Sequence, residues 1–222
     1  MRKVLVVAVH PDDETLACGG TLLRHKSMGD EVYWLIITEM TKGKGFQEHT
    51  IRKRQKEIKR VAEHYGFAKT FQMNIPTACL DQVPLSVLVE KITSILHSLE
   101  PEVLYLPFAN DVHSDHRIVF QASQSCVKAF RSPFLRTVLM METISETDNV
   151  LDPRGTCFCP NYFVDITEFL DVKVRIMNIY KGETGKHPFP RNSEVLKALA
   201  LLRGAQAFCR YAEGFMLIKQ IV

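Results

Sequence analysis

Four short runs of almost continuous apolar residues constrain the fold of this chain more than any other feature. They cover residues 3–9, 31–38, 102–108 and 136–142. A strand that is apolar on both faces is typical of a parallel sheet covered by helices on each side. A shorter run, 69–75, predicts a more peripheral strand. The sequence therefore predicts an α/β protein with a central, mostly parallel sheet.

Helical periodicity separates these runs. Leucine, isoleucine and valine recur at three- and four-residue spacing over 85–99, and a second apolar stripe begins at Leu16 and closes before Gly29 and Asp30, which signal a helix end and a turn. Strand–helix–strand repetition predicts right-handed crossovers and a Rossmann-like, doubly wound sheet with helices on both faces. Beyond residue 150 we expect a strand at 162–167, helices near 167–180 and 192–210, and a final strand at 214–221.

Composition limits the class of protein. A chain of 222 residues, 46% of them hydrophobic and without a linker or repeat, predicts one domain over residues 1–222. A net charge of +3 does not indicate a nucleic-acid partner, and no apolar run approaches a membrane span. The apolar start meets charged residues at His10 without a small-residue cleavage site, so we reject a signal peptide. Six scattered cysteines favour reduced thiols, and we expect a cytoplasmic protein.

Ionisable residues follow the first and fourth apolar runs, as His-Pro-Asp-Asp-Glu at 10–14 and within 109–117. Ligands of open α/β sheets bind at the carboxyl ends of the strands, where the strand order reverses. In the usual winding the first and fourth strands are neighbours at that point, so the two clusters should face each other. The eight side chains are His10, Asp12, Asp13, Glu14, Asp111, His113, Asp115 and His116.

Imidazole and carboxylate groups are suitable zinc ligands, and a catalytic zinc keeps three protein ligands and one open position. His10 and Asp13, three residues apart at a strand-to-helix turn, can point at one ion, and a third ligand would come from the opposite cluster. A single histidine is more often structural, and an aspartate before a helix is often a cap. Eight such groups at one edge favour a metal site. For Glu14 we expect the simpler role of a helix-start carboxylate that favours the helix dipole.

The segment "AVHPDDETLACGGTL" (8–22), with "HSDH" at 113–116, resembles the PIG-L/LmbE-like family of zinc-dependent N-deacetylases. Weaker similarity at 54–67, 164–167, 187–191 and 203–215 extends it over most of the chain, although Phe208 replaces a usual glycine. The resemblance implies Zn²⁺, with Fe²⁺ as an alternative in cells. It also implies the following roles: zinc ligands His10, Asp13 and His116, general base Asp12, oxyanion stabiliser and amine acid His113, acting as a cation, and Asp115 tuning His113.

Arg54 lies three residues after Ile51 and four before Ile58, on the apolar side of a helix. A buried arginine needs an acceptor. The resemblance implies that Arg54 contacts substrate; the alternative is a structural ion pair with an aspartate. Gly19 and Gly20 lack the spacing of a phosphate loop and predict close packing of their helix on the sheet.

The remaining histidines are scattered. We expect four of them at the surface, and the loop 187–191 either to fold over the substrate or to be a plain surface loop. The four are His25, His49, His64 and His97.

The resulting functional hypothesis is a hydrolase that removes the N-acetyl group from a small N-acetylglucosamine-type amino sugar or its conjugate. Two alternatives stay open: an amidase acting on a larger acyl amide of a sugar–thiol conjugate, and a non-catalytic nucleotide-binding module. The module would leave Asp12, Asp13, His113 and His116 unexplained. Assembly into a homo-oligomer also stays open, because no apolar stripe in the sequence indicates a subunit interface.

Overall fold

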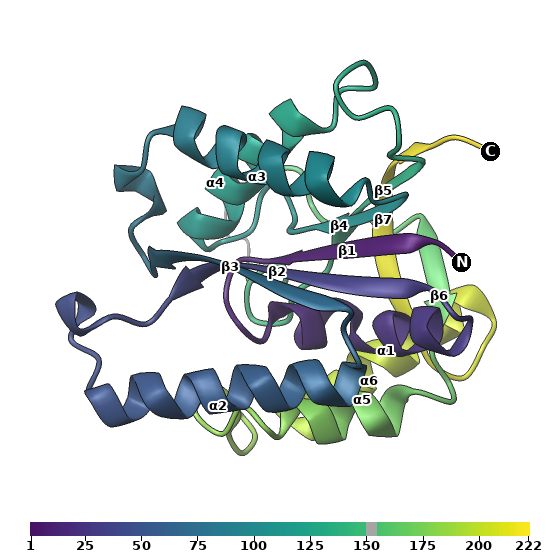
Figure 1. The fold of residues 1–222 in the computed structure, drawn as a ribbon. Helices are drawn as coiled ribbons and strands as arrows, with labels where there is room; N and C mark the ends of the chain where they lie inside the picture. Colours follow the sequence, from purple (N-terminus) through teal and green to yellow (C-terminus); the bar gives the residue numbers. More distant parts are fainter. Residues whose placement is uncertain (150–154) are drawn as a thin grey trace.

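The computed structural model describes residues 1–149 and 155–222. Its centre is a seven-stranded sheet in the order β3-β2-β1-β4-β5-β7-β6 (Figure 1). The first five strands are parallel, and β7 runs antiparallel between β5 and β6. The strands are β1 (Lys3–Ala8), β2 (Glu31–Glu39), β3 (Lys69–Pro76), β4 (Val103–Leu106), β5 (Thr137–Met141), β6 (Tyr162–Asp165) and β7 (Ala212–Gln220). The prediction of a mostly parallel sheet is confirmed.

Helices cover both faces of the sheet, as the doubly wound prediction requires. Figure 1 shows α3 and α4 on one face, and α1, α2, α5 and α6 on the other. The helices are α1 (Asp13–Ser27), α2 (Glu48–Tyr65), α3 (Leu85–Leu99), α4 (Ser114–Cys126), α5 (Leu170–Met177) and α6 (Ser193–Ala207), with 3-10 turns η1 (Lys42–Lys44) and η2 (Leu80–Gln82).

Two apolar cores lie on opposite faces of the sheet. Alternate residues of β1 enter each core: Val4 and Val6 pack under α1 and α5, whereas Leu5 and Val7 pack under α3 and α4. Every residue of β1 after Lys3 is buried. The continuous apolar runs of the sequence therefore reflect strands with helices on both sides.

Helix α1 is kinked at Cys18, whose backbone leaves the helical conformation. The kink directs the N–H groups of Gly20 and Thr21 to the Glu213 carboxylate, at 2.9 and 2.7 Å. A Cβ atom on Gly20 would lie 2.7 Å from the Cβ of Ile166, in the segment after β6. The glycine pair thus allows close packing as expected, but against neighbouring helices and this segment rather than against the sheet.

His25 is buried, which corrects the expectation that it lies at the surface. Its Nδ1 lies 2.8 Å from Asp30 Oδ2, and its Nε2 lies 2.8 Å from the Tyr105 hydroxyl. Arg2 donates to the same carboxylate at 2.8 Å. These partners satisfy the polar atoms of the ring, so the histidine can be buried at the end of α1.

Phe208 ends α6 in the left-handed conformation, with φ +56°, and its side chain is fully exposed. Glycine is the residue that adopts this conformation without steric penalty. Phe208 therefore affects the local backbone at the end of α6 and leaves the apolar core unchanged.

All six cysteines lie in the described part of the chain and are free thiols. Among the described residues, no helix combines the length and the apolar character that a membrane crossing needs.

Candidate active site

The two ionisable clusters meet where the strand order reverses. β1 pairs with β2 on one side and with β4 on the other. Helix α1 begins at Asp13, directly after β1, and α4 begins at Ser114, after β4. The carboxyl ends of the two central strands therefore bring residues 10–14 and 111–116 to the same edge, as predicted.

Three side-chain atoms form a compact triangle there. His116 Nε2 lies 3.3 Å from His10 Nδ1 and 3.3 Å from Asp13 Oδ2, and the last two atoms are 3.8 Å apart. Ligand atoms around a tetrahedral zinc stand about 3.3–3.4 Å apart, given bonds of about 2.0–2.1 Å. Asp13 Oδ1 is also buried without a hydrogen-bond partner among the described residues. The geometry and chemistry of these three side chains therefore fit a zinc ion.

Each histidine of the triangle has a carboxylate near its other ring nitrogen. His116 Nδ1 is 2.7 Å from Asp111 Oδ2, and the Thr147 hydroxyl donates to the second Asp111 oxygen at 2.6 Å. His10 Nε2 is 3.5 Å from Asp115 Oδ2, which is longer than an ordinary hydrogen bond. Such outer carboxylates fix the orientation of metal-binding histidines. The structure thus gives Asp111, whose role the sequence left open, a direct contact with His116.

Charge pairing dominates the triangle when no cation is bound. Burial disfavours the charged form of His116, but the Asp13 charge and the hydrogen bond to Asp111 outweigh it and raise the pKa of His116 to about 10. Burial likewise opposes charge on Asp13, but His116 and His10 hold the pKa of Asp13 below its usual range. A metal ion would take the place of the His116 proton, since ligand histidines bind metals in the neutral form.

Asp12, next to Asp13 in the sequence, has different surroundings. Arg191 Nη1 donates to Asp12 Oδ2 at 2.8 Å, whereas the buried Oδ1 has no hydrogen-bond partner in residues 1–149 and 155–222. Its backbone has φ +149°, which is unusual for a residue other than glycine. Burial raises the pKa of Asp12 to about 7, although the Arg191 charge opposes the shift. Such a carboxylate can exchange a proton near neutral pH.

His113 lies beside the triangle, with its ring centroid 4.6 Å from that of His10. Its Nδ1 accepts the backbone N–H of Asp115 at 3.1 Å, so the proton of the neutral ring is on Nε2. Burial, with His10 and His116 nearby, lowers the pKa of His113 to about 4. The lowered pKa favours a neutral His113 that donates a hydrogen bond through Nε2–H, whereas we expected His113 to act as a cation.

Asp115 contacts His113 through the hydrogen bond from its own backbone N–H to His113 Nδ1. Its carboxylate accepts the N–H of Ala78 at 2.8 Å and that of Leu80 at 3.3 Å, and it faces His10. Asp115 therefore links the triangle to the segment after β3.

Glu14 is completely buried and does not act as an exposed helix-start charge. It accepts the Asp12 N–H at 3.1 Å, the Thr15 hydroxyl at 2.6 Å and the Tyr180 hydroxyl at 2.8 Å. Burial raises the pKa of Glu14 to about 8. Glu14 therefore departs from the expectation of a simple helix-start charge: it is a buried carboxyl in the first turn of α1, and burial opposes its charged form while its hydrogen bonds tie this turn to Tyr180.

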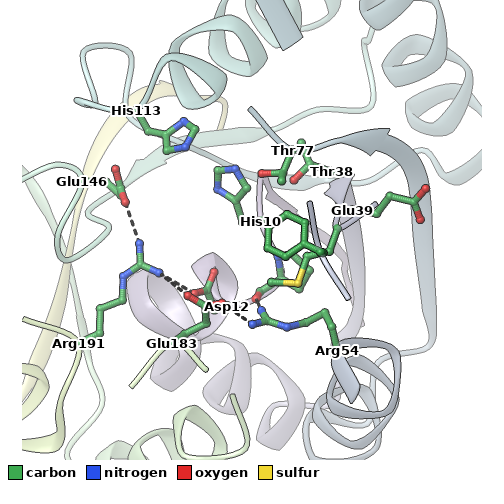
Figure 2. A pocket seen from close by; sticks show the side chains of 13 residues that line it. His10, Asp12, Thr38, Glu39, Arg54, Thr77, His113, Glu146, Glu183 and Arg191 are labelled. Atoms are coloured by element: carbon green, nitrogen blue, oxygen red, sulfur yellow. Dashed lines mark hydrogen bonds and ion pairs between the residues drawn. The ribbon is translucent and has the colours of Figure 1, made fainter. Parts of the chain in front are cut away.

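A cavity of about 320 Å³ opens over His10 and Asp12, and residues from several separate segments of the chain line it (Figure 2). Its lining is His10, Pro11, Asp12, Thr38, Glu39, Met40, Phe46, Arg54, Thr77, His113, Glu146, Glu183 and Arg191.

Arg54 is buried in α2 and lines this cavity. It donates to the Pro11 carbonyl at 2.8 Å, lies 3.2 Å from Glu57 and pairs with Glu183. Its guanidinium also lies over the Tyr180 ring. The alternative to substrate contact was an ion pair between Arg54 and an aspartate, but the acidic partners of Arg54 are two glutamates. Arg54 also lines the cavity.

Glu146, Glu183 and Arg191 lie in this site although the sequence did not single them out as site residues. Glu146 follows β5, and the other two lie between α5 and α6, where no helical or strand pattern indicates their position. The sequence contained one indication of these residues: the loop 187–191, which ends at Arg191, was expected either to fold over the substrate or to be a plain surface loop. His187 itself is exposed.

Comparisons with known proteins show what this chain is similar to. The diacetylchitobiose deacetylase of Thermococcus kodakarensis is 26% identical over 232 residues, which cover 100% of this chain and 85% of that protein. The conserved protein TT1542 from Thermus thermophilus superposes with a TM-score of 0.77 at 26% identity, over 100% of this chain and 97% of that one. GalB, the 4-carboxy-2-hydroxymuconate hydratase of Pseudomonas putida KT2440, has a TM-score of 0.75 at 18% identity, over 100% and 98%.

The GalB likeness concerns the fold alone, so the chemistry has to come from the side chains. The family model described as GlcNAc-PI de-N-acetylase matches residues 5–127, more than half of the chain and the part that holds both ionisable clusters. The chain belongs to the PIG-L family.

Proposed function

We propose that this protein is a zinc-dependent N-deacetylase that removes the acetyl group from an N-acetylglucosamine-type amino sugar or its conjugate. One observation carries the proposal: His10, a member of the triangle with Asp13 and His116, lines the same cavity as Asp12, whose buried Oδ1 has no hydrogen-bond partner among the described residues. Membership of the PIG-L family and the similarity to a diacetylchitobiose deacetylase support it.

Hydrolysis of an amide needs a strong nucleophile, stabilisation of the oxyanion and a proton for the leaving amine. Zinc held by His10, Asp13 and His116 would polarise the acetyl carbonyl and lower the pKa of a water molecule from about 16 to about 7. Asp12 Oδ1 is free to take the proton of the attacking water. His113 Nε2–H donates a hydrogen bond to the oxygen on which negative charge develops.

The protons balance in this scheme. The oxygen of water bonds to the acyl carbon, the carbon–nitrogen bond breaks, and the proton held on Asp12 passes to the nitrogen. The second proton of the water stays on the acetic acid and is released when the acid ionises at neutral pH. The products are therefore acetate, a free amine and one proton. Asp12 suits both transfers because its pKa, about 7, lies near the working pH.

The cavity suits a polar ligand of modest size. Its volume, about 320 Å³, lies at the lower end of small-molecule sites. Glu39 and Thr77 offer hydrogen-bonding groups for sugar hydroxyls, Met40 and Phe46 offer an apolar wall, and Arg54 adds a positive charge to the same lining. We propose Arg54 as a substrate-binding residue and a cytosolic setting for the enzyme, consistent with its free thiols.

The test is to measure bound metal in the purified protein and acetate released from N-acetylglucosamine, diacetylchitobiose and conjugates of N-acetylglucosamine. We expect about one zinc or iron per chain and release of acetate. Release of only a larger acyl group from a sugar–thiol conjugate would favour the amidase. Retained nucleotide without metal would favour the binding module, and bound metal without hydrolysis of any N-acetyl sugar would contradict the proposal.

A further inference from the structure

Arg191 is held on three sides. Its Nε donates to the Ser145 hydroxyl at 2.7 Å, its Nη2 to Glu146 at 2.7 Å, and its Nη1 to Asp12 Oδ2 at 2.8 Å. Figure 2 shows the guanidinium between Glu146 on one side and Asp12 and Glu183 on the other. The side chain is 16% exposed although it belongs to a surface loop. Its direction is therefore fixed by the protein before any substrate binds.

The contacts of Arg191 join two loops that are distant in the sequence. Ser145 and Glu146 follow β5, and Ser145 has φ +74°, a strained backbone for this residue. Glu183, before α6, lies 3.4 Å from Arg191 Nη1 and also pairs with Arg54. A guanidinium has five N–H donors in a rigid plane, and most of them here already have acceptors. Little donor capacity remains for a substrate.

The contact with Arg191 fixes the orientation of the Asp12 carboxylate. A carboxylate has two equivalent oxygens and rotates about its last side-chain bond unless one oxygen is held. Arg191 holds Oδ2, and Oδ1 is left buried and unpartnered among the described residues. The arrangement leaves one oxygen, in one orientation, to accept a proton.

We propose that Arg191 is a positioning residue that fixes Asp12 so that Oδ1 faces the attacking water. The proposal rests on the proposed function, because it assigns Asp12 as the proton acceptor. Arg191 acts through Asp12 and not through the substrate. Misplacement of a catalytic group by about 1 Å can cost about 10²-fold in rate.

A double-mutant cycle tests this role. The variants are Arg191→Gln, Asp12→Asn and their combination, with steady-state deacetylation, bound zinc and thermal unfolding measured for each. We expect Arg191→Gln to lower kcat by about 10²-fold with KM within about two-fold of wild type and zinc retained. In the Asp12→Asn background the same substitution should change kcat by less than about two-fold, since the group it positions is gone.

Arg203→Gln is the matched control. Arg203 also forms a two-pronged pair with a carboxylate, Glu142, and is 12% exposed, but it does not line the cavity. This control should lower stability and leave kcat unchanged. Arg191→Lys is a second variant for the case in which Arg191→Gln fails to fold. It keeps the positive charge, so it should fold, but it lacks the planar guanidinium, so its kcat should still be reduced.

The outcomes separate the two proposals. A wild-type enzyme that releases no acetate contradicts the proposed function. An active wild type whose kcat is unaffected by Arg191→Gln and Arg191→Lys contradicts the positioning role alone. A rise in KM that persists in the Asp12→Asn background would make Arg191 a substrate contact, and losses of kcat that multiply would make its effect independent of Asp12.

Discussion

Asp12 and Asp13 are neighbours with opposite surroundings, and the difference predicts opposite consequences of the same substitution. Asp12→Asn should keep the metal and lower turnover by about 10²–10⁴-fold, because an amide cannot take the proton of water. Asp13→Asn should lose metal first, because a neutral amide is a weaker ligand at the triangle. Bound zinc and acetate release, measured with and without added zinc, distinguish the variants.

Added zinc should rescue Asp13→Asn in part and Asp12→Asn hardly at all. If both variants bind equal metal and lose equal rate, the two aspartates have been assigned wrongly. Both substitutions remove one charge from adjacent residues, so a change in total charge cannot imitate this contrast.

Asp111 contacts His116, one of the three proposed metal ligands. Asp111→Asn keeps the shape of the side chain but weakens the acceptor for His116 Nδ1, 2.7 Å away. Loss of such an outer contact typically lowers metal affinity by about 10–100-fold. We expect a loss of that size in a competition titration for zinc against a chromophoric chelator.

Asp30→Asn is the control for Asp111→Asn, because Asp30 is also a buried aspartate that contacts a histidine, His25, at 2.8 Å. It is distant from the triangle in the fold, at the opposite end of α1. Zinc affinity should therefore be unchanged in this variant. Equal losses of affinity in both variants would mean that Asp111 acts only through general stability.

At the scale of elements, the sequence was informative where patterns are regular. Continuous apolar runs predicted β1, β2, β4 and β5, and their alternation with helices placed residues 10–14 opposite 111–116. The kink of α1 at Cys18 was not predictable, because the acceptor of the N–H groups that follow it, the Glu213 carboxylate of β7, lies about 190 residues away in the sequence. Long-range partners of this kind have no periodic signature.

The same reason explains the residues that were missed around the site. Arg191 reaches Asp12 from an irregular loop, and Glu146 follows β5 in another. Nothing in the local sequence indicates which acceptor a loop arginine finds. The buried state of Glu14 depends likewise on Tyr180, 166 positions further along the chain.

Helix α1 offers an element-scale prediction at Gly20. A methyl group there would lie 2.7 Å from the Cβ and Cγ2 of Ile166, so Gly20→Ala should destabilise the fold by about 1–3 kcal/mol through overpacking. Urea unfolding of Gly20→Ala and of the control Gly43→Ala measures this free energy. Gly43 has only Thr41 Oγ1 near, at 3.9 Å, so its variant should differ little from wild type. Equal stability of Gly20→Ala and wild type would contradict the tight packing.

At the scale of the whole molecule, the proposed metal site and the fold depend on different residues. The triangle lies at one edge of the sheet, on the loop after β1 and the first turns of α1 and α4, whereas the two apolar cores lie on the two faces of the sheet. Chelation of the purified protein should therefore abolish deacetylation and leave the far-UV circular dichroism spectrum unchanged. Returning zinc should restore activity without a refolding step.

A bound metal still stabilises the native state by mass action, by about 2.7 kcal/mol when the free ion is at 100 times its Kd. The chelated protein should therefore unfold cooperatively at a lower temperature, in one transition. Unfolding on chelation at 25 °C would mean that the metal holds the fold together, as in a zinc finger. That result would contradict a catalytic site built on an independently stable sheet, because Val4, Leu5, Val6 and Val7 would then be insufficient to hold β1 between its two layers of helices.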